Sequence, residues 1–322
     1  MKVEYVLQGD NLCRREHGAD QPIWIDLLDP TMEEEAEVEA KLGFSIPTKA
    51  DMADIEESAR LYDDKGAAVM TAVVVSGVKE GKPTRSQVTF ILTPDHLISV
   101  RYANAAAFNS IASTCERSGA RVASSDAVMA TVLMAIIANA AESLEDVGAD
   151  LRDVSEALFV ERETKRSPKR AENQLHAILR RLGRRNMAVA ILRESLLSLE
   201  RLLPYLRRHA GGRLVEPELT HLKQVERDVR SLSAHEAQLS LEIAYLHDAS
   251  LGLINLDQTR IIKAFSIAAV LFLPPTLVGT VYGMNFKSMP ELEWTYGYPL
   301  ALALMVGSAL LPYAWFRQRG WL

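Results

Sequence analysis

Two uncharged segments near the end of the chain decide its fold. The first is AFSIAAVLFLPPTLVGTV at residues 264–281, and the second is YPLALALMVGSALLPYAWF at residues 298–316. Each segment has the length that an α-helix needs to cross about 30 Å of hydrocarbon. The linker between them covers only residues 282–297, so we expect the two helices to form an antiparallel hairpin in a membrane.

Basic residues flank this hairpin at the ends that lie away from the linker. Arg260 and Lys263 precede the first segment, and Arg317 and Arg319 follow the second. Basic flanks stay on the cytoplasmic side, so both termini are predicted to be cytoplasmic and the linker extracytoplasmic. The aromatic residues typical of membrane interfaces are Trp294, Tyr296 and Tyr298 at one end and Tyr313, Trp315 and Trp321 at the other.

The residues before this hairpin have a different composition. The chain of 322 residues carries 36 basic and 42 acidic side chains, a net charge of −6, and most of them precede Lys263. This balance argues against a nucleic-acid partner, which needs a basic surface. The two cysteines, Cys13 and Cys115, have no Cys or His neighbours that would suggest a disulfide framework or a structural zinc site. The N-terminus shows no apolar signal-peptide core, so this part is expected to stay in the cytoplasm.

The N-terminal part is predicted to be a mixed α/β domain. Residues 22–28, 67–78 and the hairpin 87–101 are rich in strand-forming residues. Thr31 and the glutamates after it predict a capped helix that ends near residue 42. Helical patterns cover 125–161 and 169–209, where Pro204 predicts a kink or a stop. The apolar stretch 128–141 is too short to span a membrane and predicts a buried core helix.

A third helical pattern begins near Leu219 and runs without a break into the first membrane segment. Its apolar positions step by three and four, which is typical of a coiled-coil seam. They are Leu222, Val225, Val229, Leu232, Leu239, Ile243, Leu246 and Leu253. We expect one continuous helix, with this seam as the surface on which several copies associate.

The first membrane segment has features that a simple anchor does not need. Pro274 and Pro275 remove backbone donors in mid-membrane, which neighbouring structure must compensate. Small and hydroxyl-bearing side chains recur along one face of the helix at steps of three or four. One hairpin cannot enclose a pore, so a pore needs several copies around an axis.

The motif after this segment resembles a known family. Tyr282-Gly-Met-Asn-Phe286 and the Met-Pro-Glu-Leu run at 289–292 are similar to the signature of the CorA family of magnesium transporters. The stretches at 252–263, 272–278 and 321–322 also resemble the enterobacterial type of CorA, as do 24–27 and 54–60 in the N-terminal domain. The resemblance therefore covers both ends of the chain.

The resemblance implies an α+β membrane protein of the bacterial inner membrane, assembled as a homopentameric funnel. It implies an N-terminal cytoplasmic α/β domain, a long coiled-coil-like stalk helix and two C-terminal transmembrane helices. The predicted parts are a cytoplasmic domain (1–218), a stalk (219–263), a pore-lining helix (264–281), an extracytoplasmic loop (282–297), an outer helix (298–316) and a basic tail (317–322).

The resemblance also assigns roles to residues of this sequence. The selectivity filter is predicted at Gly283, Met284 and Asn285, and the pore lining at Thr259, Phe265, Leu273, Thr276 and Thr280. Thr259 stands where the family commonly has asparagine. Glu291 and Glu293 are expected to concentrate cations outside the mouth. The acids that would bind a regulatory cation are Asp63, Asp64, Glu226 and Asp228, although solvated surface acids explain each of these equally well.

Magnesium chemistry agrees with these residues. Mg²⁺ gives up its waters reluctantly, so a pore that keeps the first hydration shell needs hydrogen-bond acceptors rather than charges. Residues 264–286 contain no Asp or Glu, and Asn285 offers a neutral carbonyl oxygen. Mg²⁺ is therefore expected as substrate and regulatory ligand, possible co-substrates are Co²⁺ and Ni²⁺, and no further cofactor is expected. Two alternatives stay open, namely a zinc transporter of the same family and a membrane-anchored protein without transport; no nucleotide loop, nucleophile elbow or HExxH pattern indicates an enzyme.

Overall fold

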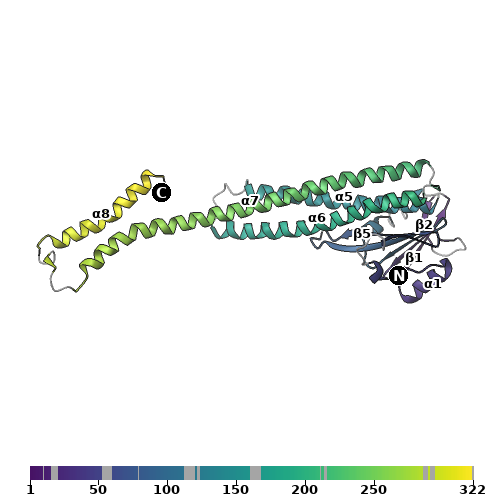
Figure 1. Cartoon of the computed structure of the whole chain (residues 1–322), viewed down its shortest axis with the longest axis horizontal. Helices are drawn as coiled ribbons and strands as arrows, with labels where there is room; N and C mark the ends of the chain where they lie inside the picture. Colours follow the sequence, from purple (N-terminus) through teal and green to yellow (C-terminus); the bar gives the residue numbers. More distant parts are fainter. Residues whose placement is uncertain are drawn as a thin grey trace. The chain divides into compact units, whose positions relative to one another are not determined.

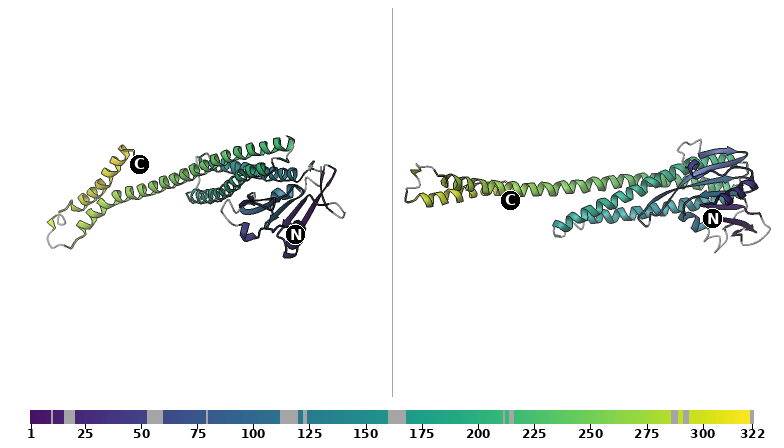
Figure 2. Two further views of the ribbon diagram at one scale, coloured as in Figure 1. Left: turned by 45° about the vertical axis from the view of Figure 1, so that its right-hand side comes forward. Right: turned by 90° about the horizontal axis from the view of Figure 1, so that it is seen from below.

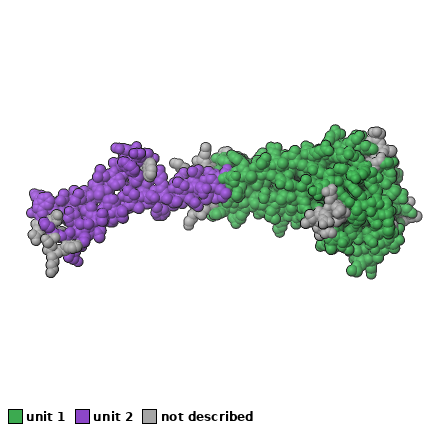
Figure 3. Space-filling model, viewed as in Figure 1, with its two compact units in different colours: residues 1–248 green, residues 249–322 purple. Residues whose placement is uncertain are grey.

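The structure is a computed structural model that describes most of the chain. The described residues are 1–9, 11–15, 21–52, 60–78, 80–111, 120–121, 124–159, 168–210, 212–213, 216–285, 289–290 and 294–320. The chain divides into two compact units, Met1–Asp248 and Ala249–Leu322 (Figure 3). The first unit carries the sheet and the second carries the helical hairpin, and each is described by itself.

The first unit is built on an eight-stranded sheet in the order β4-β5-β6-β7-β3-β1-β2-β8 (Figure 1). Its strands are β1 (Lys2–Gln8), β2 (Asn11–Arg14), β3 (Trp24–Leu28), β4 (Leu61–Asp64), β5 (Ala67–Ser76), β6 (Thr84–Leu92), β7 (Leu97–Arg101) and β8 (Ala120–Arg121). Neighbouring strands are antiparallel except β3 and β7, which are parallel. The predicted strands and the mixed α/β class are confirmed.

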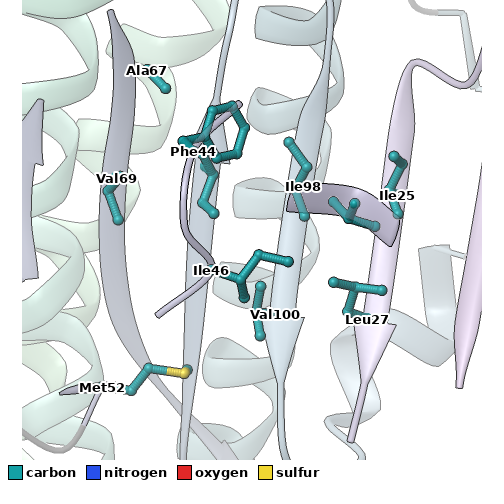
Figure 4. Packing of buried hydrophobic residues seen from close by; sticks show 11 residues of the cluster. Ile25, Leu27, Phe44, Ile46, Met52, Ala67, Val69, Ile98 and Val100 are labelled. Carbon is teal, nitrogen blue, oxygen red and sulfur yellow. The ribbon is translucent and has the colours of Figure 1, made fainter. Parts of the chain in front are cut away.

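Helices cover both faces of this sheet, which explains why β5 is buried almost from end to end. On one face, α1 (Met32–Leu42) and α2 (Lys49–Met52) complete an apolar cluster that includes Leu27, Ile46 and Val100 (Figure 4). The side chain of Thr31 caps α1 by accepting from Glu34 N, as predicted. On the other face, α5 (Ser125–Phe159) and α6 (Pro168–Ala210) pack against β5, β6 and β7.

The open edge of β5 is completed by a helix instead of a strand. β4 pairs only with Ala67–Met70 of β5, so the backbone of Val73 has no partner from β4. Ser195 Oγ donates to Val73 O at 2.6 Å, and Val73 N donates to Ser198 Oγ at 2.9 Å. Buried backbone groups require such partners, so α6 is fixed on the sheet by hydrogen bonds as well as by apolar packing.

The long helices agree with the helical patterns of the sequence, with two corrections. α6 continues through Pro204 to Ala210, so a stop at Pro204 is wrong. A proline removes a single donor from the helix, and the buried Leu202, Leu203 and Leu206 hold the helix on both sides of it. α5 buries most of its apolar residues, as predicted for the 128–141 stretch.

The second correction concerns the seam of α7 (Glu216–Tyr282), a single helix of 67 residues. Within the first unit, α5, α6 and α7 lie side by side (Figure 2). Leu222, Val229, Leu239 and Leu246 are at most 3 % exposed in the single chain. The seam is buried inside one subunit, because it packs against the neighbouring helices of its own chain. It is therefore not the surface on which copies associate, and that expectation is wrong.

One apolar and one polar contact show that α7 packs against α5 and α6 of its own chain. A Cβ added to Gly148 of α5 would lie 3.5 Å from Leu239 of α7. Glu236, which interrupts the apolar seam, accepts from Arg193 Nε of α6 at 3.0 Å. A charge in a helix seam that is paired in this way fixes the register of the two helices.

Candidate ion pathway

The second unit exposes apolar helices that a chain in water would cover. α7 and α8 (Gly297–Gln318) each contain an 18-residue window that is long and apolar enough to cross a membrane, and 0 % and 11 % of those windows are buried. α5 also meets the length and composition criteria, but 56 % of its window is buried within the chain. Exposed apolar surface on this scale indicates contact with lipid or with other copies.

The predicted pore-lining positions are all exposed on α7. Phe265 and Leu273 expose 74 % and 71 % of their surface, and Thr259, Thr276 and Thr280 are also exposed. In the single chain no neighbouring helix covers this set of side chains. A lining role is thus sterically open to these five side chains.

The threonine hydroxyls of this stripe bond to the helix backbone. Thr259 Oγ1 donates to Asn255 O at 2.8 Å, and Thr276 Oγ1 donates to Leu273 O at 2.8 Å. Thr280 Oγ1 donates to the carbonyl of Thr276. A hydroxyl has one hydrogen and two lone pairs, so each of these groups offers only acceptor capacity outward. Water molecules around a cation point their hydrogens outward and need such acceptors.

The predicted filter begins where α7 ends. Gly283 N donates to Gly279 O at 3.0 Å, and Met284 N donates to Val281 O at 3.3 Å, so the last helical turn closes around the motif. Asn285 follows and is exposed. The C-terminal end of a helix carries partial negative charge, which favours a cation at this position. Glu291 and Glu293 lie outside the described residues.

Gly279 of α7 and Gly283, which follows the end of that helix, lie in close contacts that the sequence reasoning missed. A Cβ on Gly279 would lie 3.2 Å from Met305 Cε of α8, so Met305 sits in the notch that this glycine leaves. A Cβ on Gly283 would lie 3.1 Å from the backbone oxygen of Gly279. Only Gly279 meets α8, and a small residue at a helix contact is typical of membrane helices, so this signal could have indicated the contact.

Comparisons with known proteins now identify the family. The family model described as "CorA-like Mg2+ transporter protein" matches residues 19–318. This chain belongs to the CorA family. It is 31 % identical to the magnesium transport protein CorA of Escherichia coli (strain K12), with 100 % of both chains covered. It is also 31 % identical to CorA of Haemophilus influenzae, over 93 % of this chain and 92 % of that one.

The CorA fold extends over the whole chain. The complete structure of the CorA magnesium transporter from Methanocaldococcus jannaschii matches with a TM-score of 0.79 at 18 % identity, and covers 100 % of this chain and 99 % of that one. The N-terminal α/β domain, the long helices and the two C-terminal candidate spans are therefore shared CorA features. The curated relatives named above are transport proteins and not enzymes.

The four acids predicted to bind a regulatory cation do not form one cluster: two of them contact other groups of the chain, and the other two are half-buried or exposed. Asp63 Oδ1 accepts from Gly66 N at 3.0 Å, and Asp63 Oδ2 lies 3.4 Å from His209 Nδ1. Glu226 pairs with Arg207 at 3.3 Å, whereas Asp228 is exposed. Asp64 is half-buried at the end of β4. Across the described part of the chain, no group of three or more His, Cys, Asp or Glu residues is placed to hold a metal ion.

The carboxylate of Asp63 interacts electrostatically with a side chain of the neighbouring helix α6. Burial raises the pKa of Tyr205 in α6, and the carboxylate of Asp63 raises it further. Asp63 therefore interacts electrostatically with the C-terminal end of α6, close to where Arg207 meets Glu226. Two of the four predicted regulatory acids contact the last turns of this one helix.

Proposed function

We propose that this chain forms a homopentameric Mg²⁺ influx channel of the bacterial inner membrane, with both termini in the cytoplasm. The observation that carries the proposal is the Gly283-Met284-Asn285 motif at the exposed end of α7, in a chain that belongs to the CorA family. The membrane location is supported by the exposed apolar windows of α7 and α8. The basic residues that flank the hairpin support the orientation.

The ion passes along α7 and keeps most of its first hydration shell. Five copies of Asn285 form a ring of neutral carbonyl acceptors around the hydrated ion at the outer mouth. Below it, the outward lone pairs of Thr280 and Thr276 continue the path toward the apolar constriction at Leu273. Weak holding at several sites favours passage over trapping, which suits a wall without carboxylates.

Intracellular Mg²⁺ closes the channel by binding acids at the contacts between cytoplasmic domains. The acids we assign are Asp63, Asp64, Glu226 and Asp228. We place each site between two subunits, because within one subunit the described residues bring no three such ligands together. The contact of Asp63 with His209 supplies one route from such a site to α6.

Mg²⁺ uptake into proteoliposomes with a Mg²⁺-sensitive dye inside tests the function. We expect uptake by wild type, a loss of roughly tenfold or more in Asn285→Ala, and wild-type uptake in the control Gln318→Ala on α8. A parallel measurement with a zinc dye tests the alternative within the family. Movement of Zn²⁺ without Mg²⁺ would assign the chain to zinc transport, and no movement of either ion by confirmed pentamers would refute the proposal.

A further inference from the structure

Four cationic side chains gather at one end of the helical hairpin. Among the described residues of the second unit, the cationic ones are Arg260 and Lys263 on α7 and Arg317 and Arg319 at the end of α8, against the single carboxylate of Asp257. All four are exposed. The transport path proposed above uses none of them.

The two pairs lie at the same level along the hairpin. Arg260 precedes the end of α7 at Tyr282 by 22 residues, and Arg317 follows the start of α8 at Gly297 by 20 residues. At 1.5 Å per residue these separations are about 33 Å and 30 Å. The thickness of the hydrocarbon core is about 30 Å. With the linker at one membrane surface, all four charges therefore reach the headgroups of the opposite surface.

Arg260 points away from the proposed pore, whereas Lys263 lies about 160° around the helix from Phe265 and about 40° from Thr259, at the cytoplasmic end of the lining. With 3.6 residues per turn, Arg260 lies about 100° around the helix from Thr259 and about 140° from Phe265. A cation on the pore wall would repel Mg²⁺, whereas on the outer side it faces lipid or α8. The adjoining Ile261 and Ile262 are 57 % and 66 % exposed, so apolar surface continues directly from these charges.

An aromatic ring supports the charges on α8. The guanidinium of Arg319 lies 5.4 Å from the ring centre of Trp315, and Trp315 is 50 % exposed. Trp at this level of a membrane helix is an interfacial anchor. The stacked arginine is held where its planar donors can meet a phosphate in bidentate fashion.

We propose that Arg260, Lys263, Arg317 and Arg319 form a binding belt for the phosphate groups of anionic phospholipids. The inference rests on the proposed function only for the insertion of the hairpin into a membrane. The occupant is a lipid and not a soluble anion, because the cationic groups border exposed apolar surface on both helices. A ligand that satisfies both surfaces carries a phosphate headgroup and acyl chains, and basic clusters at the cytoplasmic ends of membrane helices attract anionic lipid.

Lipid retention by the full-length protein tests the belt. The protein is reconstituted in vesicles of phosphatidylcholine and phosphatidylglycerol at about nine to one, extracted in mild detergent, purified, and its retained lipid is quantified by mass spectrometry. We expect wild type to enrich phosphatidylglycerol about fivefold over the vesicle ratio. The double variant Arg317→Gln/Arg319→Gln and the second variant Arg260→Gln/Lys263→Gln should each lose at least half of this enrichment.

Matched variants and a competitor separate the outcomes. Arg180→Gln/Arg184→Gln removes two exposed arginines of α6 in the first unit and should retain lipid as wild type does. Equal enrichment in wild type and both belt variants, or none in wild type, would overturn the belt. Displacement of the lipid by millimolar inorganic phosphate would also overturn it, because the site would then take a free anion. Mg²⁺ uptake by the same vesicles is scored separately, so enrichment without uptake refutes the transport proposal and leaves the belt standing.

Discussion

At the scale of single residues, the ion pair between Asp26 and Arg101 joins the two parallel strands at the centre of the sheet. Arg101 Nη2 lies 2.7 Å from Asp26 Oδ2, and the two side chains are 7 % and 4 % exposed. Ser99 Oγ also donates to Asp26 at 2.6 Å and accepts from Trp24 Nε1 at 3.0 Å. The ion pair and the hydrogen bonds compensate the cost of burying the Asp26 carboxylate away from water.

Removing one partner of this pair leaves the other buried without compensation. We expect Arg101→Met to lower the free energy of unfolding by about 3–5 kcal/mol. The matched control is Arg85→Met, which breaks the exposed pair with Glu194 and should cost no more than about 1 kcal/mol. Thermal and denaturant unfolding of the detergent-solubilised protein measure both variants. Equal losses of unfolding free energy in the two variants would show that the buried pair of Asp26 and Arg101 stabilises the fold no more than the exposed pair does.

Gly279 of α7 and Gly283, just after the end of that helix, make a second residue-scale prediction. A methyl group at Gly283 meets the backbone oxygen of Gly279, whereas one at Gly279 meets the flexible end of Met305. The backbone cannot yield easily, so Gly283→Ala should strain the last turn by about 1–3 kcal/mol. We expect Mg²⁺ uptake to fall more in Gly283→Ala than in Gly279→Ala, measured side by side in proteoliposomes. The reverse order would mean that the α7–α8 contact matters more than the turn.

At the scale of elements, a carboxylate on α5 fastens that helix to α6. Asp150 accepts from Arg185 Nε at 2.8 Å and also binds Arg181, and its side chain is 10 % exposed. Burial raises the pKa of Asp150, but hydrogen bonds from Arg185 and Arg181 outweigh burial, and the net pKa is lowered. The ionised Asp150 therefore stabilises the folded state fully at pH values above its pKa in the unfolded chain, which is about 4. This stabilisation is lost as the pH falls through the lower pKa that Asp150 has in the folded state.

This pH dependence is testable with Asp150→Asn. At pH 7 we expect the free energy of unfolding of the variant to be about 1.5–3 kcal/mol below that of wild type. This difference should shrink as the pH falls below about 4, because wild-type Asp150 then also loses its charge. Unfolding midpoints measured between pH 3 and pH 7 give the comparison. Asp153→Asn is the control, because Asp153 is 70 % exposed and contacts Arg181 at 3.2 Å. A difference between Asp150→Asn and wild type that stays constant over this range would contradict the assignment.

The elements differ in how far local sequence patterns predict them. Thr31 and the glutamates after it predict α1, the density of strand-forming residues predicts β5, and apolar steps of three and four predict α7, because each signal lies within one element. The pair of Asp26 and Arg101 is 75 residues apart in sequence, so it depends on the strand order that places β7 beside β3. The seam of α7 was visible as a pattern, but periodicity does not reveal whether the partner helix belongs to the same chain.

For the candidate ion pathway, too, the sequence predicts features within one element but not contacts between elements. The motif at 283–285 and the exposed threonine stripe follow from sequence, since they are local to one helix and its end. The notch at Gly279 was missed because its partner, Met305, lies on another helix. The roles of Asn285 and of the acids Asp63, Asp64, Glu226 and Asp228 depend on contacts between subunits, so they stay predictions.

At the scale of the whole molecule, the buried seam leaves another face of α7 for assembly. Leu241 and Tyr245 are 73 % and 61 % exposed and lie four residues apart, on one face of the helix. We expect Leu241→Glu/Tyr245→Glu to shift the proposed pentamer to smaller species, because charges would be buried in the subunit contact. Native mass spectrometry in detergent measures the shift, with Met187→Glu on the exposed face of α6 as the control. An unchanged pentamer fraction would place the subunit contact elsewhere.

The most direct measurement asks whether Mg²⁺ runs along the threonine face of α7. In a background with Cys13 and Cys115 replaced by Ser, single cysteines are placed at Thr276, Thr280 and Val278, and a cationic thiol reagent is applied during Mg²⁺ uptake. Val278 lies on the opposite side of the helix, about 160–200° from the two threonines. We predict that the reagent stops uptake in Thr276→Cys and Thr280→Cys and leaves Val278→Cys active. Inhibition at Val278→Cys alone, or at none of the three, would contradict a pore lined by this face.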